Sequence, residues 1–200
     1  MNTFIEKLAE ACREYRVSEK WLIAPSLRVG HQWLDGVTRA GGPVLNMHVL
    51  TIRSLAMKIL APQLADGSVV VASPAVRRLV VAAAWQRVMK DDGYLGSARP
   101  TPGLLELAER SLLDLRLAGL GPDDLDGARF EQATKGAELR DLLAAYQAEL
   151  EKRDLIDHAD AARRAVETLR ETGPPDIVVI RPDDLQLTVL ERSLVDALRA

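Results

Sequence analysis

This chain has few of the residues that disulfides, metal centres and aromatic cores require. Its 200 residues include one cysteine, Cys12, which excludes an internal disulfide and a cysteine-based zinc cluster. We expect Cys12 to be a small buried residue of an N-terminal helix. Aromatic residues make up 4% of the chain and hydrophobic residues 48%, so the core is expected to consist mainly of leucine, valine and alanine. The three histidines, at 31, 48 and 158, lack the close spacing of a metal site.

The chain also lacks an excess of positive charge and a long apolar run. Lysine and arginine total 26 against 29 aspartates and glutamates, a net charge of −3, so no overall basic field draws the chain to nucleic acid. Any contact with DNA has to be local. No apolar run is long enough to span a bilayer, and the acidic start of the chain is not a signal peptide. We therefore expect a cytoplasmic protein that does not act at a membrane.

The stretch 20–34 is typical of a buried strand, a tight turn and an amphipathic helix, where α/β nucleotide-binding domains have their phosphate loop. A working loop contains glycines that let N–H groups surround phosphate, a lysine that neutralises it, and Ser or Thr for magnesium. This turn contains no Gly-Lys-Ser/Thr sequence, and Pro25 removes a backbone donor. The sequence therefore predicts a degenerate phosphate loop, made of Ala24, Pro25, Ser26, Leu27 and Arg28.

Hydrophobic periodicity predicts alternating strands and helices at both ends of the chain. We expect strands over 21–24, 44–50 and 176–180, and a short strand over 68–72 for which a buried lead-in to a helix is the alternative. Helices are expected over 3–15, 29–40, 52–60, 74–89, 136–153 and 158–171, from 101 to a break at 119–124, and over 187–198, with a loop over 91–100. This order predicts an α/β fold: one domain over 1–200 with a parallel sheet and a mostly helical insertion over 74–171.

Four phrases, at 21–34, 49–60, 139–146 and 155–160, resemble the N-terminal, helicase-like region of PD-(D/E)XK family nucleases. The likeness is greatest to the B subunit of AddAB-type bacterial helicase–nucleases, which act in double-strand break repair and recombination. In active UvrD-like helicases the first phrase is the phosphate loop. The resemblance thus implies a P-loop-NTPase-like (RecA-like) domain whose nucleotide site is degenerate.

The second phrase resembles a Thr-Phe-His-Ser-Leu segment that lies near single-stranded DNA in these helicases. It implies candidate DNA-binding residues at Thr51, Arg53, Ser54 and Lys58. The residues themselves leave an alternative open, because Thr51 is also a suitable cap for the helix that follows.

The fourth phrase precedes the strand that, in a motor, ends with an Asp-Glu pair for magnesium and water activation. Here that strand is followed by Arg181, Asp183 and Asp184. We interpret these three residues as a degenerate metal motif, because an arginine at the metal position repels magnesium. Two ATPase motifs are thus degraded independently, which favours an inactive helicase fold.

Further charged groups each allow two interpretations. Arg28 and His31 can bind an anion at a helix N-terminus or lie on a solvated face. A second group can form a basic strip or only keep a helix soluble, and its members are Arg77, Arg78, Arg87 and Lys90.

Two acidic segments are interpreted as structural. Asp157 can cap a helix in which His158 and Asp160 are first-turn residues rather than a catalytic pair. The turns at 123–126 and 183–184 lack an EF-hand ligand pattern, so we expect loop and cap chemistry there instead of calcium binding.

Three functions follow as hypotheses. The first is a non-hydrolysing helicase-like module that guides single-stranded DNA to a nuclease site elsewhere in a longer ATP-dependent exonuclease. The second is a diverged nucleotide hydrolase, and the third is a docking module for a partner helicase-nuclease subunit (AddA-like). The resemblance implies that Mg²⁺, and in some relatives an iron–sulfur cluster, belong to a nuclease region beyond this chain. We expect no cofactor, metal or catalytic residue within the 200 residues themselves.

Overall fold

The computed structural model describes residues 3–90 and 93–199 of the chain. It is a mixed α/β structure, mostly helical, with one small parallel sheet. The chain forms two compact units: unit 1 comprises residues up to 61, 164–187 and those from 191 onward, and unit 2 comprises 62–163 and 188–190. The helical unit therefore begins and ends earlier than the 74–171 span expected from the sequence.

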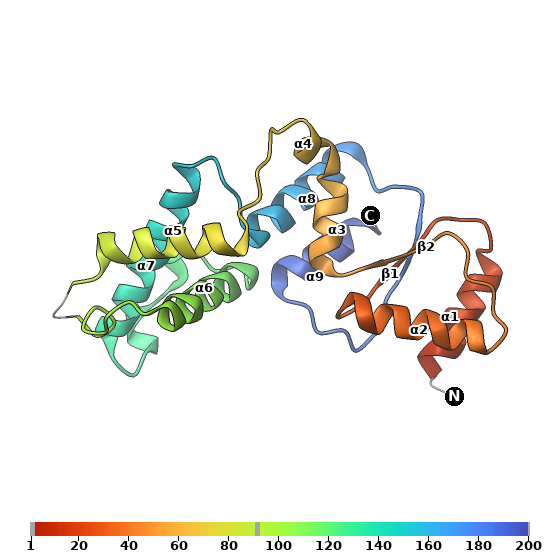
Figure 1. Cartoon of the computed structure of the whole chain (residues 1–200), viewed down its shortest axis with the longest axis horizontal. Coiled ribbons are helices and arrows are strands. Elements are labelled where there is room, and N and C mark those ends of the chain that lie inside the picture. Colours follow the sequence, from red (N-terminus) through yellow and green to blue (C-terminus); the bar gives the residue numbers. More distant parts are fainter. Residues whose placement is uncertain (1–2, 91–92, 200) are drawn as a thin grey trace. The chain divides into compact units, whose positions relative to one another are not determined.

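Unit 1 is built on three short parallel strands in the order β2-β1-β3 (Figure 1). They are β1 (Lys20–Ile23), β2 (Met47–Leu50) and β3 (Val178–Ile180), and all three were predicted. Every residue of the central strand β1 is buried, as the unbroken apolar run after its first residue predicts. Because the strands are parallel, their carboxyl ends lie at one edge of the sheet.

Helices α1 (Thr3–Glu14), α2 (Leu27–Arg39) and α3 (Ile52–Ile59) follow the predicted apolar spacing, and α9 (Val189–Ala197) lies mostly in unit 1. The core beside α1 and α2 contains Cys12, whose burial was predicted and raises the pKa of its thiol. Phe4 packs edge-on against Trp33, with ring centroids 4.8 Å apart. Lys20 is also fully buried, and its Nζ donates to the carbonyls of Tyr15 at 2.5 Å and Ser18 at 2.6 Å. The burial of Lys20 was not predicted, because the strand was expected to begin at Trp21.

Unit 2 packs α5 (Pro74–Val88), α6 (Pro102–Leu117) and α7 (Ala133–Glu151) around a leucine- and alanine-rich core. Ser73 and Thr101 cap α5 and α6, each followed by proline at the first helical position, as predicted. A short helix, α4 (Ala61–Ala65), was not predicted. Helix α8 (His158–Thr172) begins in unit 2 and continues into unit 1.

The strand expected over 68–72 is wrong. Among the described residues this segment makes only one isolated parallel bridge, between Val71 and Ile156. Ala72 N donates to the carbonyl of Ile156, and Ile156 N donates to the carbonyl of Val70. The ladder ends there because Asp157 immediately starts helix α8, so no partner strand remains. The loop expected over 91–100 forms turns from residue 93, and residues 91–92 lie outside the described residues.

A buried ionic network joins α6, α7 and α8. Asp157 caps α8, as predicted, by accepting from the backbone N–H of Ala159 and Asp160. Arg116 donates to Asp157 and to Asp160 at 2.5 Å each. Burial by itself lowers the pKa of Arg116, but the two carboxylates outweigh it and the net effect is a raised pKa. Tyr146 Oη donates to Asp157 at 3.2 Å. Burial of the hydroxyl is the main cause, and the negative charge of Asp157 the second cause, of a pKa of Tyr146 well above 10.0.

Within the described part of the chain, no helix is both long and apolar enough to cross a membrane.

We predict that Tyr146→Phe lowers the free energy of unfolding by about 1.5–3 kcal/mol, since it removes a hydrogen bond to a charged group. The pKa of Tyr146 is raised in the folded state. The stability that the Tyr146 hydroxyl contributes is therefore fully present below the ordinary pKa of 10.0 and is lost as pH rises above it. The difference between wild type and variant in urea unfolding should thus be constant from neutral pH to pH 10.0 and shrink above. Tyr94→Phe, at an exposed tyrosine, is the control. A difference that does not shrink above pH 10.0 contradicts the prediction.

Candidate functional site

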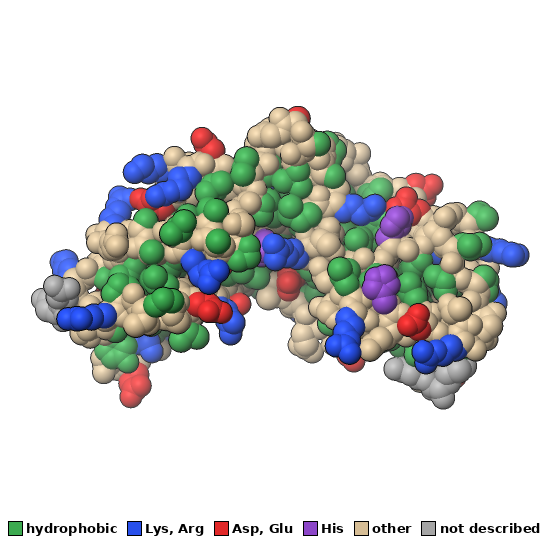
Figure 2. Space-filling model, viewed as in Figure 1, with side chains coloured by type: hydrophobic (Ala, Val, Ile, Leu, Met, Phe, Trp, Pro, Cys, Tyr) green, Lys and Arg blue, Asp and Glu red, His purple; other side chains and the backbone are tan. Residues whose placement is uncertain are grey.

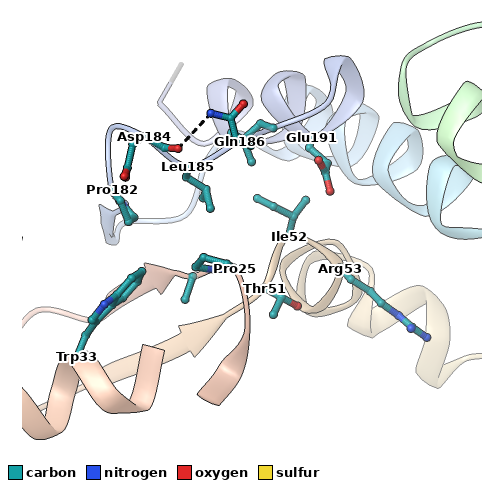
Figure 3. A pocket seen from close by; sticks show the side chains of 12 residues that line it. Pro25, Trp33, Thr51, Ile52, Arg53, Pro182, Asp184, Leu185, Gln186 and Glu191 are labelled. Atoms are coloured by element: carbon teal, nitrogen blue, oxygen red, sulfur yellow. Dashed lines mark hydrogen bonds between the residues drawn. The ribbon is translucent and has the colours of Figure 1, made fainter. Parts of the chain in front are cut away.

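A pocket of about 550 Å³ lies at the carboxyl edge of the sheet in unit 1 (Figure 3). The segments that follow the three strands bound this pocket. From β1 the chain goes first to β2 on one side and later to β3 on the other side, so the topological switch point lies between β1 and β3. Open α/β sheets bind ligands at such positions. The lining residues are Ala24, Pro25, Trp33, Thr51, Ile52, Arg53, Pro182, Asp184, Leu185, Gln186, Leu187 and Glu191.

The predicted phosphate-loop position is a turn of three residues between the end of β1 and the start of α2. Ser26 caps α2 by accepting from Val29 N at 3.3 Å, and Gly30 N donates to the carbonyl of Ser26. Ala24 N donates to the carbonyl of Leu50, which extends the pairing with β2. Pro25 lacks an N–H and the N–H of Ala24 is engaged, so two of the three turn residues offer no free backbone donor to a ligand.

The first turn of α2 presents Leu27, Arg28 and His31 to solvent. The exposed side chain of Leu27 is apolar, and Arg28 forms no ion pair with another described residue. The helix N-terminus itself retains its favourable field for an anion. Exposure of Arg28 and His31 fits the solvated-face interpretation of these residues.

Gly30 sets how closely α2 approaches the sheet. A Cβ at this position would overlap Val49 Cγ1 and lie 3.0 Å from Ala24 Cβ. Only glycine therefore fits without a shift of the helix away from β1 and β2. This requirement for glycine in α2 is one of packing against Val49, not of contact with a phosphate.

Thr51 and Ser54 form a reciprocal capping box at the start of α3. Ser54 N donates to Thr51 Oγ1 at 3.2 Å, and Thr51 N donates to Ser54 Oγ at 2.8 Å. Ser54 Oγ also donates to the carbonyl of Thr51. The alternative that Thr51 caps the helix is confirmed, and both hydroxyls are engaged in local hydrogen bonds.

The two cations of the same segment differ in their surroundings. Lys58 Nζ lies 3.7 Å from Glu19 Oε1 and 5.1 Å from the centroid of the Trp21 ring. A hydrogen bond from Trp21 Nε1 lowers the pKa of Glu19, and the charges of Lys58 and His48 add to this effect. Arg53 is exposed, and in Figure 3 its side chain extends away from the other lining side chains. Arg53 is thus the more accessible of the two cations.

The predicted degenerate metal motif lies in the turn after β3. Arg181 Nη1 donates to the carbonyl of Pro182 at 3.3 Å, and its Nε is buried without a hydrogen-bond partner among the described residues. Asp184 lines the pocket, and Asp183 lines a neighbouring pocket of about 510 Å³ with Arg181 and Lys7. Within residues 3–90 and 93–199, no three His, Cys, Asp or Glu side chains are grouped as a metal site requires.

The charges around the main pocket do not suit a nucleoside triphosphate. Its charged lining residues are Arg53, Asp184 and Glu191, so carboxylates outnumber cations. Most of the other lining side chains are apolar, including Trp33 and Ile52. Phosphoryl transfer needs positioned cations and donors, which this lining does not gather. The pocket is better suited to an apolar or weakly polar group.

The proposed basic strip is wrong for Arg77. Its side chain is buried and donates from Nε to Glu109 at 2.7 Å and from Nη1 to the carbonyl of Ala72. Arg78, Arg87 and Lys90 are exposed. The sequence pattern of α5 does not reveal the ion pair between Arg77 and Glu109, because nothing in the sequence around Arg77 identifies a partner on another helix.

The remaining acidic groups have the structural roles expected. His158 and Asp160 lie in the first turn of α8. Asp124 accepts from Gly121 N and Asp126 accepts from Ala128 N, so this turn is held by cap hydrogen bonds.

No protein-family model matches this chain, and no curated protein matches it in sequence. The likeness of the four sequence phrases to helicase-like regions therefore stays a hypothesis. The case for a function has to be made from the pocket, its charges and the surface.

We predict that Gly30→Ala lowers the free energy of unfolding by about 1–3 kcal/mol, because the added methyl group forces α2 away from Val49. Gly103→Ala in α6 is the matched control, since nothing lies within 4 Å of a Cβ there. Urea unfolding followed by circular dichroism measures both. Equal stability of the two variants would show that α2 can move without cost.

Proposed function

We propose that this chain is a non-hydrolysing, RecA-like DNA-binding and scaffold domain of the kind found in AddB-like exonuclease subunits of double-strand break repair. The observation that carries the proposal is the β1–α2 turn. It follows the central strand of a parallel sheet, as a phosphate loop does, yet Pro25 has no N–H and the N–H of Ala24 is bonded to the carbonyl of Leu50.

The topology supports the RecA-like part of the proposal. The sheet is parallel with its first strand in the centre, and helices follow β1 and β2, so the strand exits meet at a switch point, where open α/β sheets bind ligands. The exit of β3 into Arg181 and Pro182 supports the loss of hydrolysis. A guanidinium there adds positive charge where a motor holds a magnesium ion.

Arg53 supports contact with single-stranded DNA. It is exposed at the carboxyl edge of the sheet, within the segment that resembles a DNA-contacting phrase. Thr51 and Ser54 contribute by fixing the start of α3 through their capping box, rather than by free hydroxyls. Lys58 adds positive charge that Glu19 partly offsets. Few phosphates are neutralised, so binding by this segment should be weak and salt-sensitive.

The apolar pocket lining favours one alternative, a docking module for a partner helicase subunit. In that case Trp33 and Ile52 would receive an apolar side chain of the partner, and DNA affinity would not depend on Arg53. The diverged nucleotide hydrolase is disfavoured by the lining charges. Magnesium-dependent ATP turnover that is lost on changing Arg28 or Asp183 would restore it.

The proposal is tested by fluorescence anisotropy of a labelled single-stranded oligonucleotide with the whole chain at several salt concentrations. We expect salt-sensitive binding and no ATP turnover. Arg53→Ala should lower the slope of log affinity against log salt by about 0.7, the value for one phosphate contact on a single strand. Arg39→Ala, another exposed arginine of unit 1, is the control and should have a smaller effect.

Two results decide against parts of this proposal. Absence of binding at the lowest salt concentration rejects the DNA-binding role. Binding that Arg53→Ala leaves unchanged removes this segment from the DNA path, and the docking alternative for the pocket is then favoured.

A further inference from the structure

The carboxyl end of α7 in unit 2 gathers three cations around one buried carboxylate. Glu149 accepts a hydrogen bond from Arg153 Nη1, and its other oxygen lies 3.8 Å from Arg87 Nη1. The side chain of Glu149 is only 9% exposed. The hydrogen bond from Arg153 lowers the pKa of Glu149, and the charges of Arg153, Lys152 and Arg87 add to that effect. We refer to Arg87, Lys152 and Arg153 as the Glu149 cation cluster.

This cluster has more positive charge than its carboxylate neutralises. Arg87 and Arg153 lie against the buried carboxylate of Glu149, and the exposed Lys152 precedes Arg153 in the chain, whereas the whole chain has a net charge of −3. Two further carboxylates lie near in sequence: Glu151, about 200° around α7 from Glu149, and Asp154, which follows Arg153 after the end of the helix. Helix α5, which supplies Arg87, contains no acidic residue. Figure 2 shows lysine and arginine side chains on the surface of unit 2, with aspartate and glutamate side chains among them.

The donors of the cluster remain available to a ligand. The Arg87 side chain is 61% exposed, and its distance of 3.8 Å to Glu149 is too long for a hydrogen bond. The Arg153 side chain is 39% exposed even though it pairs with Glu149. Exposed guanidinium groups fixed by a buried carboxylate are well suited to phosphate oxygens, because each presents several N–H donors in a planar fork.

We propose that the Glu149 cation cluster binds the phosphodiester backbone of single-stranded DNA. This inference rests on the proposed function and adds to it a second contact surface, formed by α5 and the end of α7 instead of by the α3 segment. Glu149 has a defined part in it: its charge orients Arg153 and Arg87 but also competes with phosphate for them. Neutralising Glu149 and neutralising the cations should therefore have opposite effects on DNA affinity.

The first experiment measures single-stranded DNA binding by Arg87→Gln/Lys152→Gln, which leaves Arg153 paired with Glu149. Two lost phosphate contacts should lower the salt slope by about 1.4 and the affinity at low salt on the order of tenfold. Arg110→Gln/Arg140→Gln is the control with the same change in net charge. Those two arginines are exposed and each pairs with its own neighbouring carboxylate.

The second experiment uses Glu149→Gln, which keeps the shape of the side chain and removes its charge. We expect tighter binding and a steeper salt dependence, with circular dichroism unchanged. Equal losses in the cluster variant and in the control, or no gain from Glu149→Gln, overturn the cluster as a DNA site while wild-type binding still supports the proposed function. If wild type does not bind DNA, the proposed function and this inference both fail.

Discussion

Unit 1 depends on the burial of β1 between two parallel neighbours. All four residues of this strand are buried, and its hydrogen bonds run to β2 on one side and β3 on the other. Residues far apart in the sequence, near 23, 50 and 180, are thereby brought to one edge. The pocket exists because of this convergence, since each strand exit supplies one part of its wall.

The same constraint explains why the edge can keep its shape without nucleotide chemistry. Close contact between Gly30 and Val49 holds α2 against the sheet, and Ser26 and the Thr51–Ser54 box fix where α2 and α3 begin. These interactions need no phosphate and no metal.

Sequence periodicity predicted the three strands and most helices because each has a strong local signal: an apolar run, a cap or a proline at the first helical turn. It failed where the outcome depends on a distant partner. The segment at 68–72 has strand-like residues but meets only Ile156 before α8 begins. Arg77 has the sequence surroundings of a surface cation, and only the fold brings Glu109 within 2.7 Å of it. For the site, the absence of a Gly-Lys-Ser/Thr sequence from the turn after β1 was visible in the sequence, whereas the apolar lining of the pocket depends on residues of the distant loop after β3.

The net charge of the chain does not show which parts of its surface can bind other molecules. A total of −3 argues against a general attraction to nucleic acid, yet it averages over residues with very different surroundings. Arg77 and Arg116 are buried and paired with carboxylates within unit 2, so their charges are offset inside the protein. Glu149 is buried as well and pairs with Arg153, while the side chain of Arg87 beside it remains 61% exposed. The surface charge that a polyanion encounters is therefore set by which ion pairs the fold buries, and this can be positive locally on an acidic protein.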